Sequence, residues 1–583
     1  MRKTKIVATI GPASESAETV ASLIQAGMNV ARLNLSHGKR EELCRRIETV
    51  RVQAEKAGVP VAILLDTRGP EIRIKTFLRG PVTLVRGQEF TLTTREVRGD
   101  QTRVSVTYSG LPGDVEVGSE VLLDDGNIIL RVKEIRPPDV VCQVVDGGLL
   151  SDWKKVSLPG AGLGLPVLTE NDRDDVRLGV EMGVDFIAVS FVRKPEDVLE
   201  VRRLVEEWGG DQHLIAKVET RECVGNLEGI LKVSDGLMVA RGDLGVEFPV
   251  EEVPVLQKEM IHRCNELGKP VITATQMLES MIHNPRPTRA EASDAANAIF
   301  DGTDAVMLSA ETAVGEYPVE AVRTMARIAS RAEQALDYEK MLANRKPGPA
   351  SSVTDAISHA TCTTAQDLKV EAVVTATQSG HTARMVSKYR PQAPIIAVTP
   401  KPEVARRLCL SWGVFPLTVQ PSDNTDETIE RAVETALDAG MVHEGALVVI
   451  TAGVPVGVTG TTNLIKVHTV GQVMVRGTGI GHRSATGRVC VVASAAEALE
   501  KVETGDILVA STTNPDYMPA IKRAAALVVE EGGLTSHAAT TGLSLNLPVV
   551  VGAARATEIL RSGMVVTIDG TRGLVYRGKA RVL

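Results

Sequence analysis

A lysine and several carboxylates lie at the ends of apolar segments of this chain. The stretch LIAKVET (214–220) has the composition of a buried strand, yet Lys217 and Glu219 lie two positions apart near its end. Because side chains alternate along a strand, both should point to the same side. Asp243 follows the next apolar segment. Two carboxylates beside a lysine are typical of a sparse Mg²⁺ or Mn²⁺ site that handles phosphate groups.

Such a site predicts phosphoryl transfer. In that reaction the protein mainly positions its groups and stabilises the charge that spreads over the transferring phosphoryl oxygens. The sequence contains no G-x-x-x-x-G-K-[ST] motif, so we do not expect a P-loop to hold a nucleotide.

Eight short apolar runs, separated by helix-like segments, predict the elements that position these residues. Alternation of strands and helices implies parallel β/α units, and eight units suggest a (β/α)8 barrel, whose active site lies at the carboxyl ends of the strands. The predicted strands are 5–10, 29–36, 61–67, 185–191, 214–219, 236–241, 271–275 and 305–309.

Polar residues gather at the ends of five of these strands. They are Arg32, Asn34 and Ser36 on the second, Asp66, Thr67 and then Arg73 on the third, Lys217 and Glu219 on the fifth, Gly242 and Asp243 on the sixth, and Thr275 on the seventh. Unrelated ion pairs would explain any one of them. Five strands ending in polar groups favour one shared cleft at the mouth of the barrel.

Composition divides the rest of the chain into further domains. We expect a barrel at 1–69 and 166–342, a small β-barrel lid inserted at 70–165, an α/β domain at 343–475 and an extra domain at 476–583. The stretch ANRKPGPASS (343–352) has the composition of a linker. The glycine-rich stretch RGTGIGHRSATG (476–487) is interpreted as a connector.

Overall composition excludes several classes of function. A formal net charge of −8 gives no general attraction to nucleic acid or to an anionic membrane. No apolar run approaches the roughly 20 residues that a membrane helix needs. Seven cysteines without a C-x-x-C pair predict reduced thiols in a cytoplasmic protein. We therefore expect neither a nucleic-acid partner nor a membrane partner.

Over about residues 1 to 472 the chain resembles the pyruvate kinases. The stretches that carry the resemblance include TKIVATIGPAS, MNVARLNLSHG, LLDTRGPEIR, IAKVET, VARGDLGVE, NPRPTRAEASDAANAIFDGTDAVMLSAETAVGEYP and GTTNLIKV. The resemblance implies a (β/α)8 barrel with a β-barrel lid and an α/β regulatory domain. It also implies transfer of a phosphoryl group from phosphoenolpyruvate to ADP, which gives ATP and pyruvate. Mg²⁺ or Mn²⁺, K⁺ and a homotetramer are usual in this family.

The resemblance also implies a role for each matching residue. Arg32 would bind the substrate phosphate, Lys217 would follow the phosphoryl group, and Gly242, Asp243 and Thr275 would hold the substrate, with Thr275 a candidate proton relay. Glu219 and Asp243 would bind the divalent metal, Asn34, Ser36, Asp66 and Thr67 would bind K⁺, and Arg73, Lys154 and His37 would contact the nucleotide. One position departs from the family, which usually has glycine where this chain has Lys155. Either Lys154 or Lys155 therefore remains able to reach the nucleotide.

A hydroxyl-rich turn before a helix predicts an anion site in the third domain. It comprises Thr377, Ser379, Gly380, His381 and Thr382, and the loop 453–463 could close on it. In the family, phosphorylated effectors bind here, such as AMP, a sugar monophosphate or fructose 1,6-bisphosphate. Ordinary helix capping is the alternative for each hydroxyl.

The last 106 residues, 478–583, lie outside the common pyruvate kinase plan. The stretch GGLTSHAATTGLSLNLPVVVG (532–552) is similar to the mobile phosphohistidine domain of enzymes that use phosphoenolpyruvate, with His537 at the phosphorylated position. No ATP-grasp domain is recognisable, so a structural or regulatory role is favoured over a live phosphohistidine. A dikinase-type relay and a catalytically silent metabolite sensor remain as alternative functions.

Overall fold

The structure is a computed structural model, and it describes residues 1–36, 40–161, 164–348, 352–422, 424–454, 461–471 and 473–582. It divides into two compact units, which are described separately. One comprises residues 1–337 with 402–416, and the other comprises 338–401 with 417–583.

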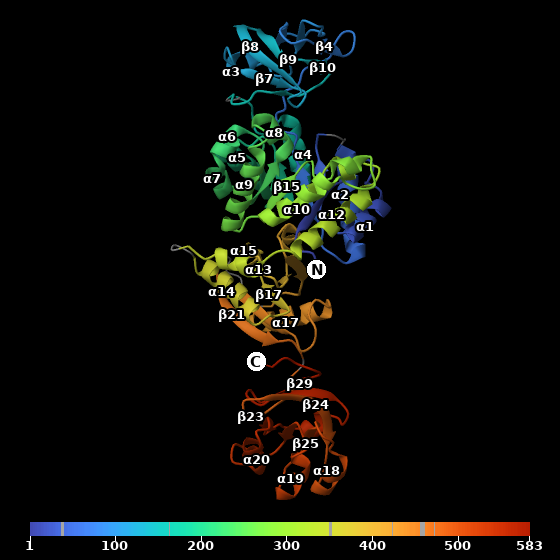
Figure 1. Cartoon of the computed structure of the whole chain (residues 1–583), viewed down its shortest axis with the longest axis vertical. Helices are drawn as coiled ribbons and strands as arrows, with labels where there is room; N and C mark the ends of the chain where they lie inside the picture. The colour runs from blue at the N-terminus through green and yellow to red at the C-terminus, as the bar shows by residue number, and fades with distance from the viewer. Residues whose placement is uncertain are drawn as a thin grey trace. The chain divides into compact units, whose positions relative to one another are not determined.

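Eight parallel strands form a closed barrel in the first unit, as the eight apolar runs predict (Figure 1). The strands are β1 (Lys5–Thr9), β2 (Val30–Asn34), β3 (Ala62–Asp66), β12 (Phe186–Val189), β13 (His213–Val218), β14 (Gly236–Ala240), β15 (Val271–Ala274) and β16 (Ala305–Leu308). Each strand pairs with its neighbours in chain order, and β16 pairs with β1 to close the ring. Nearly every strand residue is buried, because the barrel interior covers one face and the helices cover the other.

Alternation along the strands decides which side chains face the barrel axis. Val30, Leu64 and Ile215 belong to one buried cluster with residues of other barrel strands, so they fill the interior. Side chains two positions further along the same strands must face the same way. Arg32, Asp66 and Lys217 occupy those positions.

Helices surround the barrel and bury their apolar faces against the outside of the strands. They are α1 (Ala17–Ala26), α2 (Arg40–Ala57), α4 (Glu170–Glu181), α5 (Pro195–Glu207), α6 (Arg221–Gly225), α7 (Leu227–Val233), α8 (Arg241–Glu247), α9 (Val253–Leu267), η1 (Glu279–Ile282), α10 (Arg289–Asp301), α11 (Ala310–Ala313) and α12 (Pro318–Glu333). Local sequence sets several of their ends. Thr288 and Glu291 form a capping box at the start of α10, and Gly302 ends that helix at φ 98°.

The segment Pro402–Pro416 packs at the amino-terminal end of the barrel, although the chain reaches it only after leaving the first unit. It contains α16 (Pro402–Leu408). Cys409 and Leu410 join the buried cluster of the barrel interior. Arg406 donates to Asp185 at 2.7 Å, and Arg51 donates to the same carboxylate at 2.8 Å. The Asp185 side chain is only 1% exposed, so this carboxylate joins two arginines at a buried point.

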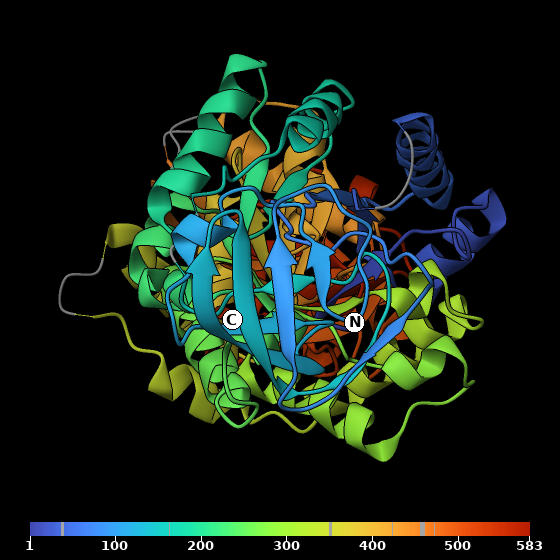
Figure 2. The ribbon, with the colours of Figure 1, turned by 90° about the horizontal axis from the view of Figure 1, so that it is seen from above.

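The insertion after β3 forms the predicted β domain, which we call the lid. It contains a six-stranded sheet and a two-stranded sheet. Figure 2 shows this domain from above. Its core contains buried residues such as Phe90 and Leu130. The elements are β4 (Val82–Leu84), β5 (Glu89–Thr93), β6 (Arg103–Ser105), α3 (Leu111–Asp114), β7 (Glu120–Leu123), β8 (Ile128–Arg136), β9 (Asp139–Asp146), β10 (Gly148–Leu150) and β11 (Val156–Ser157).

An α/β portion opens the second unit, in agreement with the predicted α/β domain. Its five-stranded sheet has the order β19-β18-β17-β20-β21. The elements are α13 (Tyr338–Asn344), α14 (Val353–Asp367), β17 (Ala372–Ala376), α15 (His381–Lys388), β18 (Ile395–Thr399), β19 (Val414–Thr418), α17 (Thr425–Asp438), β20 (Leu447–Gly453) and β21 (Thr462–Thr469).

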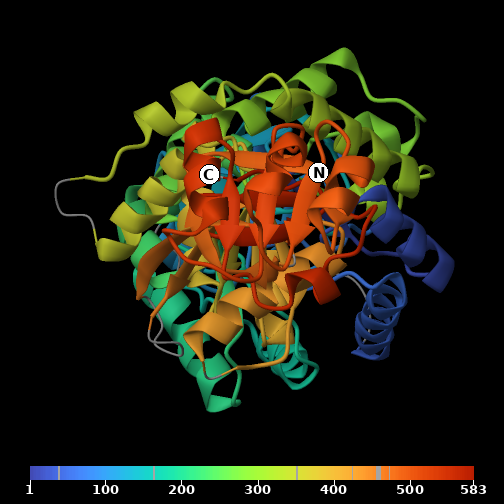
Figure 3. The same ribbon diagram turned by 90° about the horizontal axis from the view of Figure 1, so that it is seen from below.

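An eight-stranded sheet organises the C-terminal domain (Figure 3). Its elements are β22 (Val473–Arg476), β23 (Thr478–Ile480), β24 (Ser484–Val491), α18 (Ala495–Lys501), β25 (Ile507–Ala510), η2 (Pro515–Tyr517), α19 (Met518–Ile521), β26 (Ala526–Val529), α20 (His537–Leu545), β27 (Val549–Val551), α21 (Ala556–Ile559), β28 (Val565–Asp569) and β29 (Leu574–Arg577).

The interpretation of 476–487 as a connector is wrong, because most of this stretch lies in strands of that sheet. β23 pairs with β27, and β24 pairs with β28 and β25. The glycines here allow neighbouring backbone segments to approach each other closely. A Cβ on Gly477 would lie 2.5 Å from the carbonyl oxygen of Val551. Glycine in a strand can mark such a close approach as well as a loop.

The predicted architecture is confirmed: a (β/α)8 barrel, an inserted β lid, an α/β domain and an extra C-terminal domain are all present. Across the described ranges, no helix is long and apolar enough to cross a membrane.

We expect Asp185→Ala to destabilise the barrel unit by about 3–5 kcal/mol, because it leaves Arg51 and Arg406 without their shared buried carboxylate. Denaturant unfolding of the whole chain measures this. The matched control is Asp211→Ala, which removes a 75%-exposed carboxylate that pairs with Arg407. Its effect should stay below about 1 kcal/mol. Equal effects of the two substitutions would contradict the role of Asp185.

Candidate functional site

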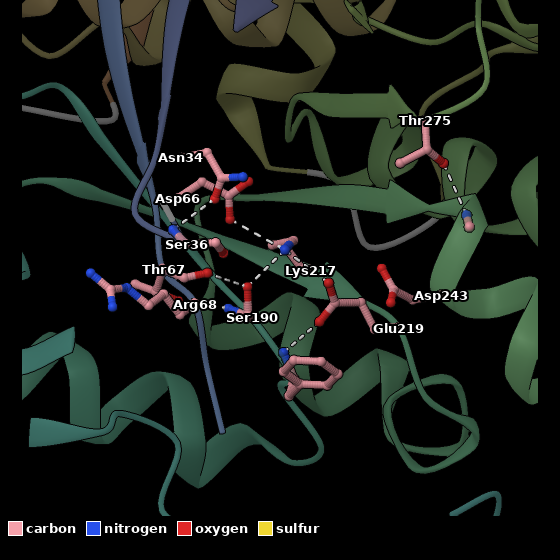
Figure 4. Close-up of polar contacts among 12 residues, drawn as sticks. Asn34, Ser36, Asp66, Thr67, Arg68, Ser190, Lys217, Glu219, Asp243 and Thr275 are labelled. Atoms are coloured by element: carbon pink, nitrogen blue, oxygen red, sulfur yellow. Dashed lines mark hydrogen bonds and ion pairs between the residues drawn. The ribbon is translucent and has the colours of Figure 1, made fainter. Parts of the chain in front are cut away.

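Lys217 lies at the centre of a cluster of polar side chains at the carboxyl ends of the barrel strands (Figure 4). Its Nζ is 2.8 Å from Glu219 Oε1, 3.2 Å from Asp66 Oδ1 and 2.7 Å from Ser190 Oγ. The prediction that Lys217 and Glu219 point to one place is therefore confirmed. Three different strands supply the partners of this one ammonium group.

The ammonium group of Lys217 stays charged in this environment. Burial by itself lowers the pKa of a lysine, but Asp66 and Glu219 raise it more, so the pKa of Lys217 lies above its ordinary value. The side chain is 12% exposed, so solvent screens these interactions weakly. A fixed positive charge therefore faces the mouth of the barrel.

Asp66 joins Lys217 to Arg32. Arg32 Nε donates to Asp66 Oδ2 at 2.6 Å, and its NH1 donates to Thr9 Oγ1 at 3.0 Å. Burial raises the pKa of a carboxyl group, but Lys217 and Arg32 together hold the pKa of Asp66 below its ordinary value. In the pairing of β2 with β3, Asn34 lies opposite Asp66, and Arg32 lies opposite Leu64, two positions before Asp66.

Ser190, at the end of the fourth predicted strand, is a member of the cluster that sequence reasoning missed. Its hydroxyl accepts from Lys217 and donates to the carbonyl oxygen of Thr67 at 2.6 Å, and its backbone N–H donates to Thr67 Oγ1 at 3.0 Å. The signal that could have found it is the one used for the other strands, a polar residue that closes an apolar run.

Glu219 and Asp243 form the candidate divalent-metal site. Glu219 is buried, and its Oε2 accepts from the backbone N–H of Phe191 at 2.6 Å. Burial raises the pKa of Glu219 and the nearby charge of Asp243 adds to the rise, although Lys217 opposes it. Within the described part of the chain, no group of three or more His, Cys, Asp or Glu side chains is placed to hold a metal. Two carboxylates fit a hard cation that takes its other oxygen ligands from water and a phosphorylated substrate.

Oxygen-bearing side chains near Asp66 form the candidate monovalent-cation site. Asn34 Oδ1 accepts from the backbone N–H of Ser36 at 3.1 Å, so this turn holds the Asn34 side chain in place (Figure 4). Asp66 and Thr67 are buried beside it. The donor set is one carboxylate, one amide and two hydroxyls, which suits a hard cation.

Thr275 is held in a strained conformation at the end of β15. Its φ of 64° is rare for a β-branched residue, and such strain costs about 1–3 kcal/mol. The Thr275 hydroxyl accepts from the backbone N–H of Gly242 at 2.9 Å and donates to the carbonyl oxygen of Ala274 at 2.7 Å. Arg241 donates to the carbonyl oxygens of Ala274 and Thr275 and so fixes the turn. The predicted pair of Gly242 and Thr275 is therefore in direct contact.

Arg73 and Lys154, which are expected to contact the nucleotide, and the alternative residue Lys155 lie where the lid joins the barrel. Arg73 donates to Glu71 and to the carbonyl oxygen of Trp153. Lys154 pairs with Asp124 of the lid at 2.6 Å and is 38% exposed. Lys155 instead forms an ion pair with Asp243. His37 lies outside the described residues.

The turn expected to bind an effector lines a pocket in the α/β portion of the second unit. Gly380 has a φ of 77° and its N–H donates to Thr377 Oγ1 at 3.0 Å, while Ser379 and His381 line the same pocket. Thr382 Oγ1 is 2.8 Å from Thr462 Oγ1. Arg431 adds a positive charge to the lining. Of the loop predicted to close on this turn, residues 455–460 lie outside the described ranges.

His537 begins α20 in the C-terminal domain, directly after its N-cap Ser536. Its Nδ1 is 3.2 Å from Thr513 Oγ1 and its Nε2 is 3.4 Å from Thr541 Oγ1. Both ring nitrogens therefore face hydroxyl groups of the same domain.

Family models match three parts of the chain. Residues 1–322 match the barrel domain of pyruvate kinase, residues 355–468 match its alpha/beta domain, and residues 502–573 match the mobile domain of PEP-utilising enzymes. The expected similarity of the C-terminal domain to that mobile domain is confirmed.

Curated relatives match over their full length. A pyruvate kinase of Bacillus licheniformis is 56% identical and one of Geobacillus stearothermophilus is 54% identical, each over 100% of both chains. Among solved structures, a pyruvate kinase from Cryptosporidium parvum is 40% identical, with a TM-score of 0.76, over 80% of this chain and 96% of that chain.

Proposed function

The chain belongs to the pyruvate kinase family, and from this premise we propose how its barrel mouth transfers the phosphoryl group of phosphoenolpyruvate to ADP. The observation that carries the proposal is the ammonium group of Lys217, which contacts Glu219, Asp66 and Ser190 from three strands. A charge already fixed in this way stabilises a transition state without reorganisation during the reaction. Lys217 is proposed to follow the phosphoryl group as it passes to ADP.

Arg32 is proposed to bind the phosphate of phosphoenolpyruvate. Its guanidinium group is anchored by Asp66 and Thr9, so its orientation at the mouth is fixed before substrate arrives. A planar guanidinium with several N–H donors suits phosphate oxygens better than a single ammonium does. Arg32 and Lys217 therefore present two cations to the same substrate group.

Glu219 and Asp243 are proposed to hold Mg²⁺ or Mn²⁺, and Asn34, Ser36, Asp66 and Thr67 are proposed to hold K⁺. Bound there, the cations would supply positive charge against the phosphoryl group and the enolate. The protein's contribution is a set of oxygen ligands fixed by hydrogen bonds, such as that from the Phe191 N–H to Glu219.

Thr275 is proposed to relay a proton, through water, to the carbon of the enolate that remains after phosphoryl transfer. The new C–H bond completes pyruvate, and the proton comes from solvent. The hydroxyl is held by Gly242 and Ala274, which orients it toward the mouth rather than making it acidic. The strain at Thr275 supports a positioning function of this turn.

Arg73 and Lys154 are proposed to contact the ADP phosphates. Lys154 is more exposed than Lys155, and its present partner, Asp124, belongs to the lid. A partly exposed ion pair contributes little free energy, so Lys154 can exchange Asp124 for a phosphate group at a small cost in free energy. This supports Lys154 over Lys155 as the nucleotide ligand.

We expect Lys217→Met to reduce turnover by about three orders of magnitude or more while the protein stays folded. Asp66 keeps Arg32 and Glu219 keeps the Phe191 N–H, so neither carboxylate is left without a partner. A coupled pyruvate assay and circular dichroism measure the two properties. Lys258→Met, which changes a 67%-exposed lysine, is the control. Turnover close to wild type in Lys217→Met would reject the assignment.

The pocket beside α15 is proposed to bind a phosphorylated effector such as AMP, a sugar monophosphate or fructose 1,6-bisphosphate. The lining provides hydroxyls from Ser379 and Thr382 and a cation from Arg431, which together suit a phosphate group. A homotetramer is proposed with it, because effectors commonly act through subunit interfaces.

Arg431→Met should weaken effector binding about tenfold, as expected for the loss of one charge-assisted contact. Calorimetric titration with AMP, ribose 5-phosphate and fructose 1,6-bisphosphate measures the affinity and identifies the effector. Arg488→Met, on the C-terminal domain and 64% exposed, is the control. If none of the three compounds binds the wild-type protein, the effector proposal fails.

The C-terminal domain is proposed to have a structural or regulatory role. Hydroxyls of Thr513 and Thr541 lie within 3.4 Å of the His537 ring nitrogens and can satisfy both without phosphorylation. Incubation with labelled phosphoenolpyruvate, followed by mass spectrometry under mildly basic conditions, should find no phosphate on His537. A stable label on that residue would support a live phosphohistidine instead.

A further inference from the structure

The side chain of Lys155 reaches from the base of the lid into the mouth of the barrel. Its backbone is fixed on the lid side, where the carbonyl oxygen of Lys155 accepts from the N–H of Asp124 at 3.1 Å and the next residue, Val156, donates to Ile72 at 2.8 Å. Its Nζ forms an ion pair with Asp243 at the start of α8. One side chain therefore links the lid to a proposed ligand of the divalent metal.

The surroundings of Lys155 hold its ammonium group on Asp243. The side chain is 13% exposed, and its Nζ lies 5.1 Å from the centre of the Phe191 ring. A cation over an aromatic face gains further attraction. Lys154 makes a different contact, because it pairs with Asp124 within the lid. Of these two neighbouring lysines, Lys155 is the one that contacts the barrel.

Three carboxylates and three cations are paired at the mouth. Asp66 forms ion pairs with Arg32 and Lys217, Glu219 forms one with Lys217, and Asp243 forms one with Lys155. A divalent ion that enters between Glu219 and Asp243 adds two positive charges at a point where Lys155 already provides one. The divalent ion and the ammonium group of Lys155 would repel each other beside Asp243, and this repulsion is strong where solvent screening is weak.

We propose that Lys155 is the resident counterion of Asp243 and that a divalent metal must displace it to bind. Lys155 thereby sets the metal affinity of the free enzyme and couples metal binding to the attachment of the lid. This inference rests on the proposed role of Asp243 as a metal ligand.

A cavity beside Lys155 provides the place to which its ammonium group moves. The cavity has a volume of about 380 Å³ and is lined by Lys155 and Phe191, by the acidic residues Glu71, Glu222 and Glu247 and by the basic residues Arg193 and Arg221. A displaced lysine therefore finds other carboxylates within the same cavity. The charge of Lys155 remains compensated there, while the lid loses its link to Asp243.

Titration of the full-length protein with Mn²⁺, without substrates, tests the displacement. Electron paramagnetic resonance measures free Mn²⁺ and gives its dissociation constant. Lys155→Met should bind Mn²⁺ about tenfold more tightly than wild type, because it removes the competing cation. Lys154→Met is the matched control and should leave the dissociation constant unchanged. Lys155→Gln gives the same test with a polar side chain if the methionine variant folds poorly.

A further variant separates this inference from the proposed function. Asp243→Asn should abolish Mn²⁺ binding over the concentrations used for the wild-type titration. If Asp243→Asn binds Mn²⁺ like wild type, the proposed metal site is wrong. If Asp243→Asn loses the metal but Lys155→Met binds it no more tightly than wild type, the metal site stands and the counterion role of Lys155 is overturned.

Hydrogen exchange gives a second readout that does not depend on activity. In the metal-free protein, Lys155→Met should increase the exchange of the Val156 amide, which donates to Ile72 at the base of the lid. Saturating Mn²⁺ should produce a similar increase in wild type. Exchange at Val156 that responds neither to the substitution nor to the metal would overturn the coupling to the lid.

Discussion

The buried ammonium group of Lys217, held between Asp66 and Glu219, is the interaction on which the mouth of the barrel depends. Burying a charge without a partner is costly, so each carboxylate here requires a cation and each cation requires a carboxylate. Arg32 and Lys155 complete the pairing at Asp66 and Asp243. The groups that stabilise the resting site are the ones proposed to contact the phosphorylated substrate and the metal.

The packing of the barrel fixes the positions of these charged side chains. Apolar side chains such as Val30, Leu64 and Ile215 fill its interior, and the polar residues stand two positions beyond them on the same strands. The amino-terminal end is closed by the segment 402–416, which Asp185 ties to the barrel through Arg406. The polar residues at the carboxyl ends of the strands are therefore held in position by the packed interior and by the buried ion pair at the amino-terminal end.

Much of the fold could be predicted because its signals are local. Eight apolar runs, a turn-rich insertion and a linker are visible in neighbouring residues, and the eight runs all became barrel strands. The glycine-rich stretch 476–487 was misinterpreted because glycine has two uses. The sequence does not distinguish a glycine that bends a loop from one, such as Gly477, that lets two backbones approach closely.

The sequence by itself determined the period-two placement that aims Lys217 and Glu219 at one point, the strand-end positions of Arg32, Asp66 and Thr275, and the family to which the chain belongs. Only the tertiary structure decided the partner of each charge. Ser190 reaches Lys217 from the end of another strand, and Lys155 reaches from the lid to Asp243, 88 residues further along the sequence. Such pairings depend on how distant segments meet in space, which a local pattern of residue types does not encode.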